Sequence, residues 1–145
     1  MSDGYPLETY RGSVNAWECD ENVHMNVRFF AARAMEGLGF IAAALDMPRA
    51  FQDRASATLL PLDMHVRFLR EAKMGAPLSM RGGVVDISGD RITVFQEMFH
   101  ADGATAATFL VKLAHVDPRD LRPFPFASRV LEKAAALRCR VPKHG

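Results

Sequence analysis

Residues 26–45 read NVRFFAARAMEGLGFIAAAL, and this stretch constrains the fold of the whole chain. Alanine is frequent, β-branched residues are few and apolar residues recur every three or four positions, which together predict a helix. The helix is apolar nearly all round, with charges only at Arg28, Arg33 and Glu36. Such a helix is normally buried on most of its sides, so another element of this short chain must wrap around it.

Strand-like segments on both sides of the helix can supply that wrapper. The predicted strands are residues 10–18, 58–69, 77–87, 91–101 and 105–116. The turns Ser88-Gly89-Asp90 and Asp102-Gly103 are typical of hairpins, so the last three strands should run antiparallel. A second helix is predicted at residues 126–137. The order of elements predicts an α+β fold, in which a five-stranded antiparallel sheet curls around a long central helix.

The composition indicates one domain spanning residues 1–145. Hydrophobic residues make up 49% of the chain and the formal net charge is +1, so nucleic acid and anionic membranes are not expected partners. No apolar run approaches the roughly 18 residues of a membrane span, and the polar, acidic N-terminus does not resemble a secretory signal. Cys19 and Cys139 lie far apart without metal-ligand spacing, so we expect reduced thiols in a cytoplasmic protein.

The densest polar cluster in the first half of the chain is WECDENVHMN, residues 17–26, at the start of the central helix. Helix N-termini carry unpaired N–H groups and a positive partial charge, which can hold a carboxylate or a developing oxyanion. Asp20 is therefore a candidate nucleophile or general base, and backbone N–H groups around Val27 are candidate donors. In the simpler interpretation, Asp20 or Asn26 only caps the helix and His24 is an ordinary loop residue. A metal site is not predicted, because no fourth ligand accompanies these residues.

Two segments resemble a known family. Residues 14–26, VNAWECDENVHMN, resemble the Asp-x-x-Gly-His-x-Asn motif of 4-hydroxybenzoyl-CoA-type hotdog-fold thioesterases, which lies at the same junction of first strand and central helix. Residues 68–78, FLREAKMGAPL, resemble the end of that family's second strand. The resemblance covers residues 10–125. It implies a hotdog fold, hydrolysis of an acyl-CoA substrate without a cofactor, and a homodimer or homotetramer with the active site between subunits.

The resemblance also implies a role for each motif residue. Asp20 matches the catalytic aspartate, which attacks the thioester carbonyl or activates a water molecule. Val27 matches the position whose backbone N–H polarises that carbonyl. His24 and Asn26 match the remaining polar positions, which orient substrate or water.

Four positions depart from the family pattern. The motif glycine is Val23, so the turn must tolerate a β-branched residue where a positive φ is costly. The second asparagine of a common pair is Val27, and a usual tyrosine is Phe30. An acid often found further along the helix falls at Met35, with Glu36 one position away and about 100° around the helix.

Two alternative functions fit the same segment. A hotdog hydratase or dehydratase uses a motif resembling Asp-x-Asn-x-x-His, whereas this chain offers Asp20-x-Asn22-x-His24, one residue short. A non-catalytic acyl-CoA-binding module needs the same pocket as a hydrolase and is not excluded by the sequence. The acyl group stays open, since the likeness of residues 70–72 to thioesterases of carnitine and betaine breakdown is too weak to name it.

Other polar residues have ordinary interpretations. Structural histidines are expected at positions 65, 100 and 115, because all three lie on predicted strands. Surface charge is the expected role of Arg67, Arg70, Lys73 and Arg81, although such side chains can also meet the phosphates of coenzyme A.

Overall fold

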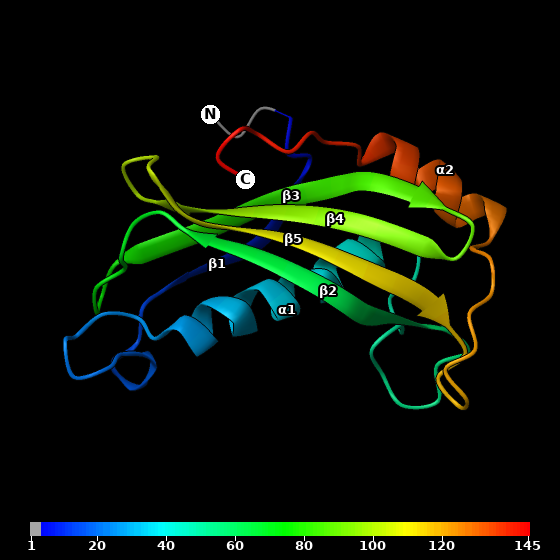
Figure 1. The fold of residues 1–145 in the computed structure, drawn as a ribbon, viewed down its shortest axis with the longest axis horizontal. Coiled ribbons are helices and arrows are strands. Elements are labelled where there is room, and N and C mark those ends of the chain that lie inside the picture. Colours follow the sequence, from blue (N-terminus) through cyan, green and yellow to red (C-terminus); the bar gives the residue numbers. More distant parts are fainter. Residues whose placement is uncertain (1–3) are drawn as a thin grey trace.

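The computed structural model describes residues 4–145; residues 1–3 of the polar N-terminal stretch lie outside it. One sheet curls around helix α1 (Figure 1). The elements in chain order are β1 (Leu7–Ser13), the short 3-10 helix η1 (Ala16–Glu18), α1 (Val27–Ala44), β2 (Thr58–Phe68), β3 (Pro77–Ser88), β4 (Arg91–His100), β5 (Thr105–Val116) and α2 (Ser128–Ala136). The predicted element order is therefore confirmed.

The sheet has the strand order β1-β3-β4-β5-β2, and every neighbouring pair is antiparallel. The two predicted hairpin turns are present, with positive φ at Gly89 and Gly103. The register shifts once in each of the four strand pairs, for example between Pro61 and Asp63 in β2. Such bulges increase the local twist, which lets a sheet of this length curl around one helix.

Helix α1 begins after the N-cap residue Asn26, whose side chain accepts a hydrogen bond from the Arg28 N–H at 3.1 Å. One face of the helix is fully buried against the sheet through residues such as Leu38 and Ile41. The opposite face is open, and Phe40 keeps 60% of its surface exposed. We expected α1 to be buried on most of its sides. In a single chain only the face that packs against the sheet is buried.

Helix and sheet approach closely at Gly37. The side-chain amide of Gln96, on β4, is fully buried and donates to the Ala34 carbonyl oxygen at 2.9 Å. A Cβ atom added at Gly37 would overlap the Gln96 Oε1 atom. The absence of a side chain at Gly37 therefore sets the distance between α1 and the sheet.

The first strand begins and ends earlier than predicted, since β1 starts at Leu7 rather than at residue 10. We expected residues 10–18 to be extended, but β1 ends at Ser13 and η1 follows it. The Glu18 side chain accepts a hydrogen bond from the Asn15 N–H at 2.8 Å, which closes this turn. Val14 and Glu18 are both buried, and this pattern imitates the alternation of a strand.

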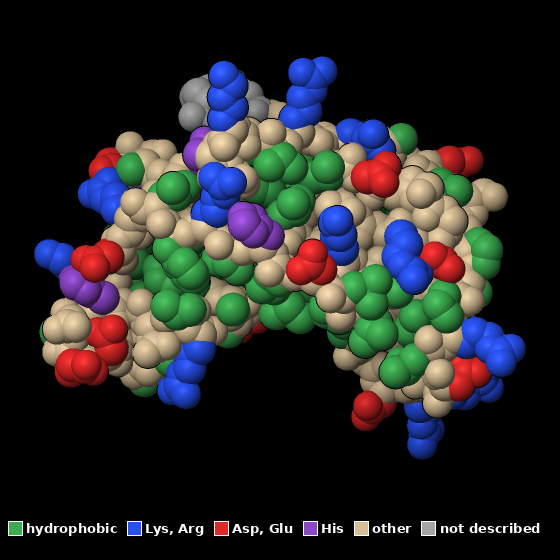
Figure 2. Space-filling model, viewed as in Figure 1, with side chains coloured by type: hydrophobic (Ala, Val, Ile, Leu, Met, Phe, Trp, Pro, Cys, Tyr) green, Lys and Arg blue, Asp and Glu red, His purple; other side chains and the backbone are tan. Residues whose placement is uncertain are grey.

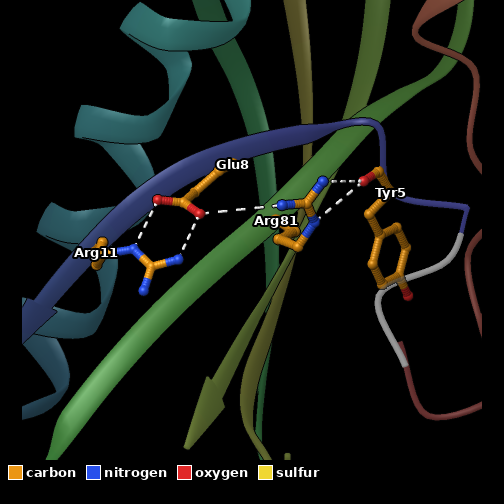
Figure 3. A network of polar contacts seen from close by, with 4 residues as sticks. All are labelled: Tyr5, Glu8, Arg11 and Arg81. Atoms are coloured by element: carbon orange, nitrogen blue, oxygen red, sulfur yellow. Dashed lines mark hydrogen bonds and ion pairs between the residues drawn. The ribbon is translucent and has the colours of Figure 1, made fainter. Parts of the chain in front are cut away.

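An ionic network fastens β1 to β3 (Figure 3). Arg81 donates to the Tyr5 carbonyl oxygen at 2.9 Å and lies 4.0 Å from the Glu8 carboxylate. Glu8 also pairs with Arg11 at 2.8 Å. The guanidinium of Arg81 is thus engaged within the sheet, which argues against the alternative that it meets a coenzyme A phosphate.

The C-terminal helix α2 packs against β3, and its Arg129 pairs with Asp46 just beyond the end of α1 at 3.0 Å (Figure 1). Its buried residues Val130 and Ala134 join the core cluster that contains Leu38 and Ile41. The predicted helix is confirmed, with ends one or two residues inside the predicted range. No helix within residues 4–145 combines the length and the hydropathy needed to cross a membrane.

Candidate active site

A cavity of about 400 Å³ opens at the N-terminal end of α1. The four predicted site residues Asp20, His24, Asn26 and Val27 all line it. The remaining wall comes from Asn22 and Met25 in the same loop, from Phe30 on α1 and from residues 68–71, where β2 ends. The fold therefore brings together both segments that carried the family resemblance. The catalytic roles of the four residues stay a prediction.

The loop between η1 and α1 is shaped partly by Asp20 itself. Its Oδ1 atom accepts hydrogen bonds from the Asn22 N–H at 2.9 Å and the His24 N–H at 3.4 Å. Its backbone N–H donates to the His24 carbonyl oxygen at 3.0 Å. The Oδ2 atom has no hydrogen-bond partner among residues 4–145. Asp20 therefore stabilises its own turn while one carboxylate oxygen stays available, and the helix cap is Asn26.

Val23 adopts the left-handed conformation that glycine would favour, with φ of 64°. A β-branched side chain is strained in this conformation, so valine in place of the motif glycine destabilises the turn, as expected from the sequence. Neighbouring backbone compensates: the Met25 N–H donates to the Ala72 carbonyl oxygen at 2.7 Å, and the Met74 N–H donates to the Val23 carbonyl oxygen at 3.2 Å. These bonds tie the loop to the segment between β2 and β3.

The first backbone amide of α1 is free. Asn26 uses its side chain to accept from the Arg28 N–H and its carbonyl oxygen to accept from the Phe29 N–H at 2.9 Å. Within the described part of the chain, the Val27 N–H meets no acceptor. A helix N-terminus also carries positive partial charge, so this N–H can stabilise an oxygen that gains negative charge.

His24 has a partner that the sequence did not suggest. Its Nε2 atom lies 3.3 Å from the Glu71 carboxylate, and both residues line the cavity. Glu71 was not predicted as a site residue, because no sequence pattern pairs a position after β2 with the first loop. The contact gives His24 a defined orientation toward one wall of the cavity.

Aromatic rings form the apolar wall of the cavity. Phe30 and Phe68 meet edge to face, with ring centroids 5.4 Å apart. Arg70 lines the same wall but pairs with Asp102 at 2.8 Å. Glu36, the nearest acid to the family position occupied by Met35, pairs with Arg33 at 2.7 Å and does not line the cavity.

Other candidate groups contribute little chemistry here. Burial, followed by the nearby charges of Asp20 and Glu18, raises the pKa of the Cys19 thiol, so Cys19 is not a competing nucleophile at neutral pH. His115 is packed between the rings of Phe124 and Phe126. No group of three or more potential metal ligands occurs among residues 4–145.

The chain is similar to known proteins in sequence. The family model described as Thioesterase-like superfamily matches residues 14–134. An L-carnitine dehydrogenase/betainyl-CoA thioesterase of Agrobacterium fabrum is 29% identical over 118 residues, which cover 79% of this chain and 24% of that protein. A betainyl-CoA thioesterase of Pseudomonas aeruginosa is 25% identical over 132 residues, which cover 90% of this chain and 83% of that protein. This chain thus spans about a quarter of the first relative and most of the second.

The fold is also found in solved structures. A Staphylococcus aureus protein, determined in complex with CoA, has a TM-score of 0.82 at 18% identity. The superposition covers 95% of this chain and 91% of that one. At this identity the likeness shows the fold alone, and the predicted hotdog fold is confirmed.

Proposed function

Because the chain belongs to the thioesterase-like superfamily, a family of thioester hydrolases, we propose that it hydrolyses acyl-coenzyme A thioesters with Asp20 as the reacting carboxylate. One observation carries the proposal. Asp20, whose Oδ2 atom has no hydrogen-bond partner among residues 4–145, and Val27, whose N–H meets no acceptor in that range, line the same cavity. Thioester hydrolysis needs these two groups, a base or nucleophile and a donor for the carbonyl oxygen.

The proposed reaction has two possible first steps. As nucleophile, Asp20 attacks the thioester carbonyl carbon, the coenzyme A thiolate leaves and takes up a proton, and water hydrolyses the resulting mixed anhydride. As general base, Asp20 removes a proton from a water molecule while the water oxygen attacks the carbonyl carbon, and the coenzyme A thiolate then leaves and takes up a proton. In both, negative charge grows on the carbonyl oxygen and the Val27 N–H stabilises it, while His24 and Asn26 orient substrate or water.

Betainyl-CoA is the acyl-CoA that we propose to test first. Two relatives are named for it, and the cavity combines features that suit a trimethylammonium group. The rings of Phe30 and Phe68 offer aromatic surface, and Asp20 and Glu71 supply negative charge. Aromatic faces and carboxylates together favour quaternary ammonium ligands.

Thiol release from a panel of acyl-CoAs tests the proposal. The informative pair is betainyl-CoA and tert-butylacetyl-CoA, because they have nearly the same shape and differ by one positive charge. The ammonium group also activates the carbonyl by induction, so each kcat/KM is divided by the rate constant of uncatalysed hydrolysis of the same thioester. We expect this normalised value to be at least about ten-fold higher for betainyl-CoA, and Glu71→Gln to reduce the ratio. Equal normalised values would reject recognition of a cationic acyl group but would leave the proposed thioester hydrolysis intact. No thiol release from any thioester that binds would favour the non-catalytic acyl-CoA-binding module.

A second copy of the chain completes the cavity in our proposal. Among residues 4–145, β2 pairs with β5 on one side and with no strand on the other, so this edge can accept a strand from a second copy. Hydrophobic side chains of β2 and α1, among them Leu62 and Phe40, are exposed. Figure 2 shows the molecular margin hollowed between its two ends, where Figure 1 places β2 and α1. An unpaired edge beside exposed apolar residues favours self-association.

Sedimentation of the purified chain checks the assembly. We expect a dimer or tetramer at micromolar concentration, with the apolar surface beside β2 buried between copies. A species of 16.1 kDa, the mass of one chain, would contradict the proposal.

A further inference from the structure

A buried ion pair lies directly behind the loop that carries Asp20. Glu18 ends η1 two residues before Asp20 and is fully buried, and Arg33 lies in the second turn of α1 with 16% of its side chain exposed. The Arg33 guanidinium contacts the Glu18 carboxylate. Neither residue lines the cavity, so they cannot touch a substrate there.

Glu18 holds both ends of the loop. Its Oε1 atom accepts from the Asn15 N–H, which fixes the turn leading into the loop. Its carbonyl oxygen accepts from the Asn26 N–H at 2.7 Å, which fixes the residue that leaves the loop and caps α1. Asp20 follows Glu18 by two residues, and Val27 follows Asn26, which is hydrogen-bonded to Glu18. Glu18 therefore contacts the chain near both Asp20 and the Val27 N–H.

Arg33 connects Glu18 to helix α1. Its guanidinium lies 5.6 Å from the centre of the Tyr10 ring on β1 and also pairs with Glu36. Although burial lowers the pKa of Arg33, the hydrogen bond and charge of Glu18 raise it above its ordinary value. Glu18 raises the pKa of Arg33 more than Glu36 does, so Glu18 is its main counter-charge, although the Arg33 Nε atom is buried without a partner among residues 4–145. Loss of Arg33 leaves the fully buried Glu18 carboxylate without its counter-charge, whereas loss of Glu18 leaves Arg33 paired with Glu36 alone.

We propose that Glu18 and Arg33 are positioning residues that set the Asp20 carboxylate relative to the Val27 N–H. The inference rests on the proposed function, since it assigns both residues to the geometry of thioester hydrolysis. A misplacement of about 1 Å costs up to roughly a hundred-fold in rate. The pair should therefore affect turnover more than substrate binding.

Near-isosteric neutral variants test the pair. Glu18→Gln keeps the shape but can accept from only one of its two donors, the Asn15 N–H or Arg33. Arg33→Gln removes the other charge, and the double variant removes both. Glu36→Gln is the matched control, because it removes the exposed partner of Arg33 and leaves the buried one. kcat and KM are measured well below each melting temperature, beside wild type and Asp20→Asn.

We expect Glu18→Gln to lower kcat at least about ten-fold with KM changed less than about two-fold, and Glu36→Gln to resemble wild type. The double variant should be no slower than the slower single variant, because the two residues act as a unit. A lower melting temperature with unchanged kcat overturns the inference and leaves the pair purely structural. If Arg33→Gln does not fold, Glu18→Gln and its control decide the question.

The parallel Asp20→Asn measurement separates this inference from the proposed function. When Asp20→Asn is inactive and Glu18→Gln is as active as wild type, only the positioning role is wrong. When Asp20→Asn keeps its activity, the proposed mechanism is wrong and the positioning role is rejected with it.

Discussion

Asp20→Asn is expected to lower kcat at least about a hundred-fold while the fold and acyl-CoA binding persist. An amide keeps the shape of the carboxylate, and its oxygen can still accept the Asn22 and His24 N–H groups that Asp20 accepts. It cannot act as an anionic nucleophile or as a base at neutral pH, and general-base contributions alone are about 10²–10⁴-fold. Steady-state thiol release, thermal melting and ligand binding measure the three quantities separately.

Two variants in the same loop serve as controls. Glu21→Gln makes the same change of charge at an exposed neighbour that does not line the cavity, so it should leave kcat unchanged. His24→Ala should have a smaller effect than Asp20→Asn, because His24 orients rather than reacts in the proposed mechanism. Near wild-type turnover by Asp20→Asn would show that Asp20 only stabilises its own turn. The non-catalytic acyl-CoA-binding module would then be the favoured function.

Heavy-oxygen labelling distinguishes the two first steps. Under single-turnover conditions in labelled water, a nucleophilic Asp20 passes one of its unlabelled carboxylate oxygens to the product and itself gains label when the anhydride is hydrolysed at the aspartyl carbon. A general base sends the label directly to the product acid. Mass spectrometry of the peptide containing Asp20 reads the difference.

Gly37 and Gly39 lie two residues apart on α1, Gly37 buried and Gly39 exposed. We expect Gly37→Ala to lower the free energy of unfolding and Gly39→Ala to raise it. Alanine at an exposed helix position gains about 1 kcal/mol over glycine, and a Cβ atom at Gly39 meets nothing within 4 Å. At Gly37 the same atom overlaps buried Gln96 Oε1. Overpacking and a broken Gln96–Ala34 hydrogen bond together cost roughly 3 kcal/mol, which exceeds the helix-propensity gain.

The net expectation for Gly37→Ala is a loss of about 2 kcal/mol, or roughly 6–8 °C in melting temperature for a domain of this size. Gly39→Ala should raise the melting temperature by a few degrees. Denaturant unfolding of both variants at equal pH provides the free energies. A stabilised Gly37→Ala would mean that the spacing between α1 and the sheet is not set at this position.

The sequence was sufficient for those features that depend on local periodicity. The α1 helix and the strands β2 to β5 were predicted within one or two residues, because each combines a clear pattern with a recognisable end. The end of β1 was wrong because buried Val14 and Glu18 flank a turn at the spacing of a strand. The pattern of apolar residues alone does not distinguish a continuous strand from a turn with a buried residue on each side.

The predicted site residues came from one continuous motif, and the cavity contains all four. Its other wall could not be predicted in the same way. Glu71 reaches His24, and Phe68 reaches Phe30, only because the segment after β2 crosses to the loop before α1. The buried pair of Glu18 and Arg33 was also missed, since a charged residue in a sequence is expected at the surface.

The strand order has a kinetic consequence. β3, β4 and β5 are joined by tight turns, so their pairing closes only short loops, whereas β1 reaches β3 across α1 and β2, and β2 reaches β5 across β3 and β4. The two walls of the cavity extend from the two strands with distant partners, one from the segment after β1 and the other from the end of β2. The cavity wall at Phe68 therefore cannot be fixed in the sheet until β5, the last strand along the chain, is present to pair with β2.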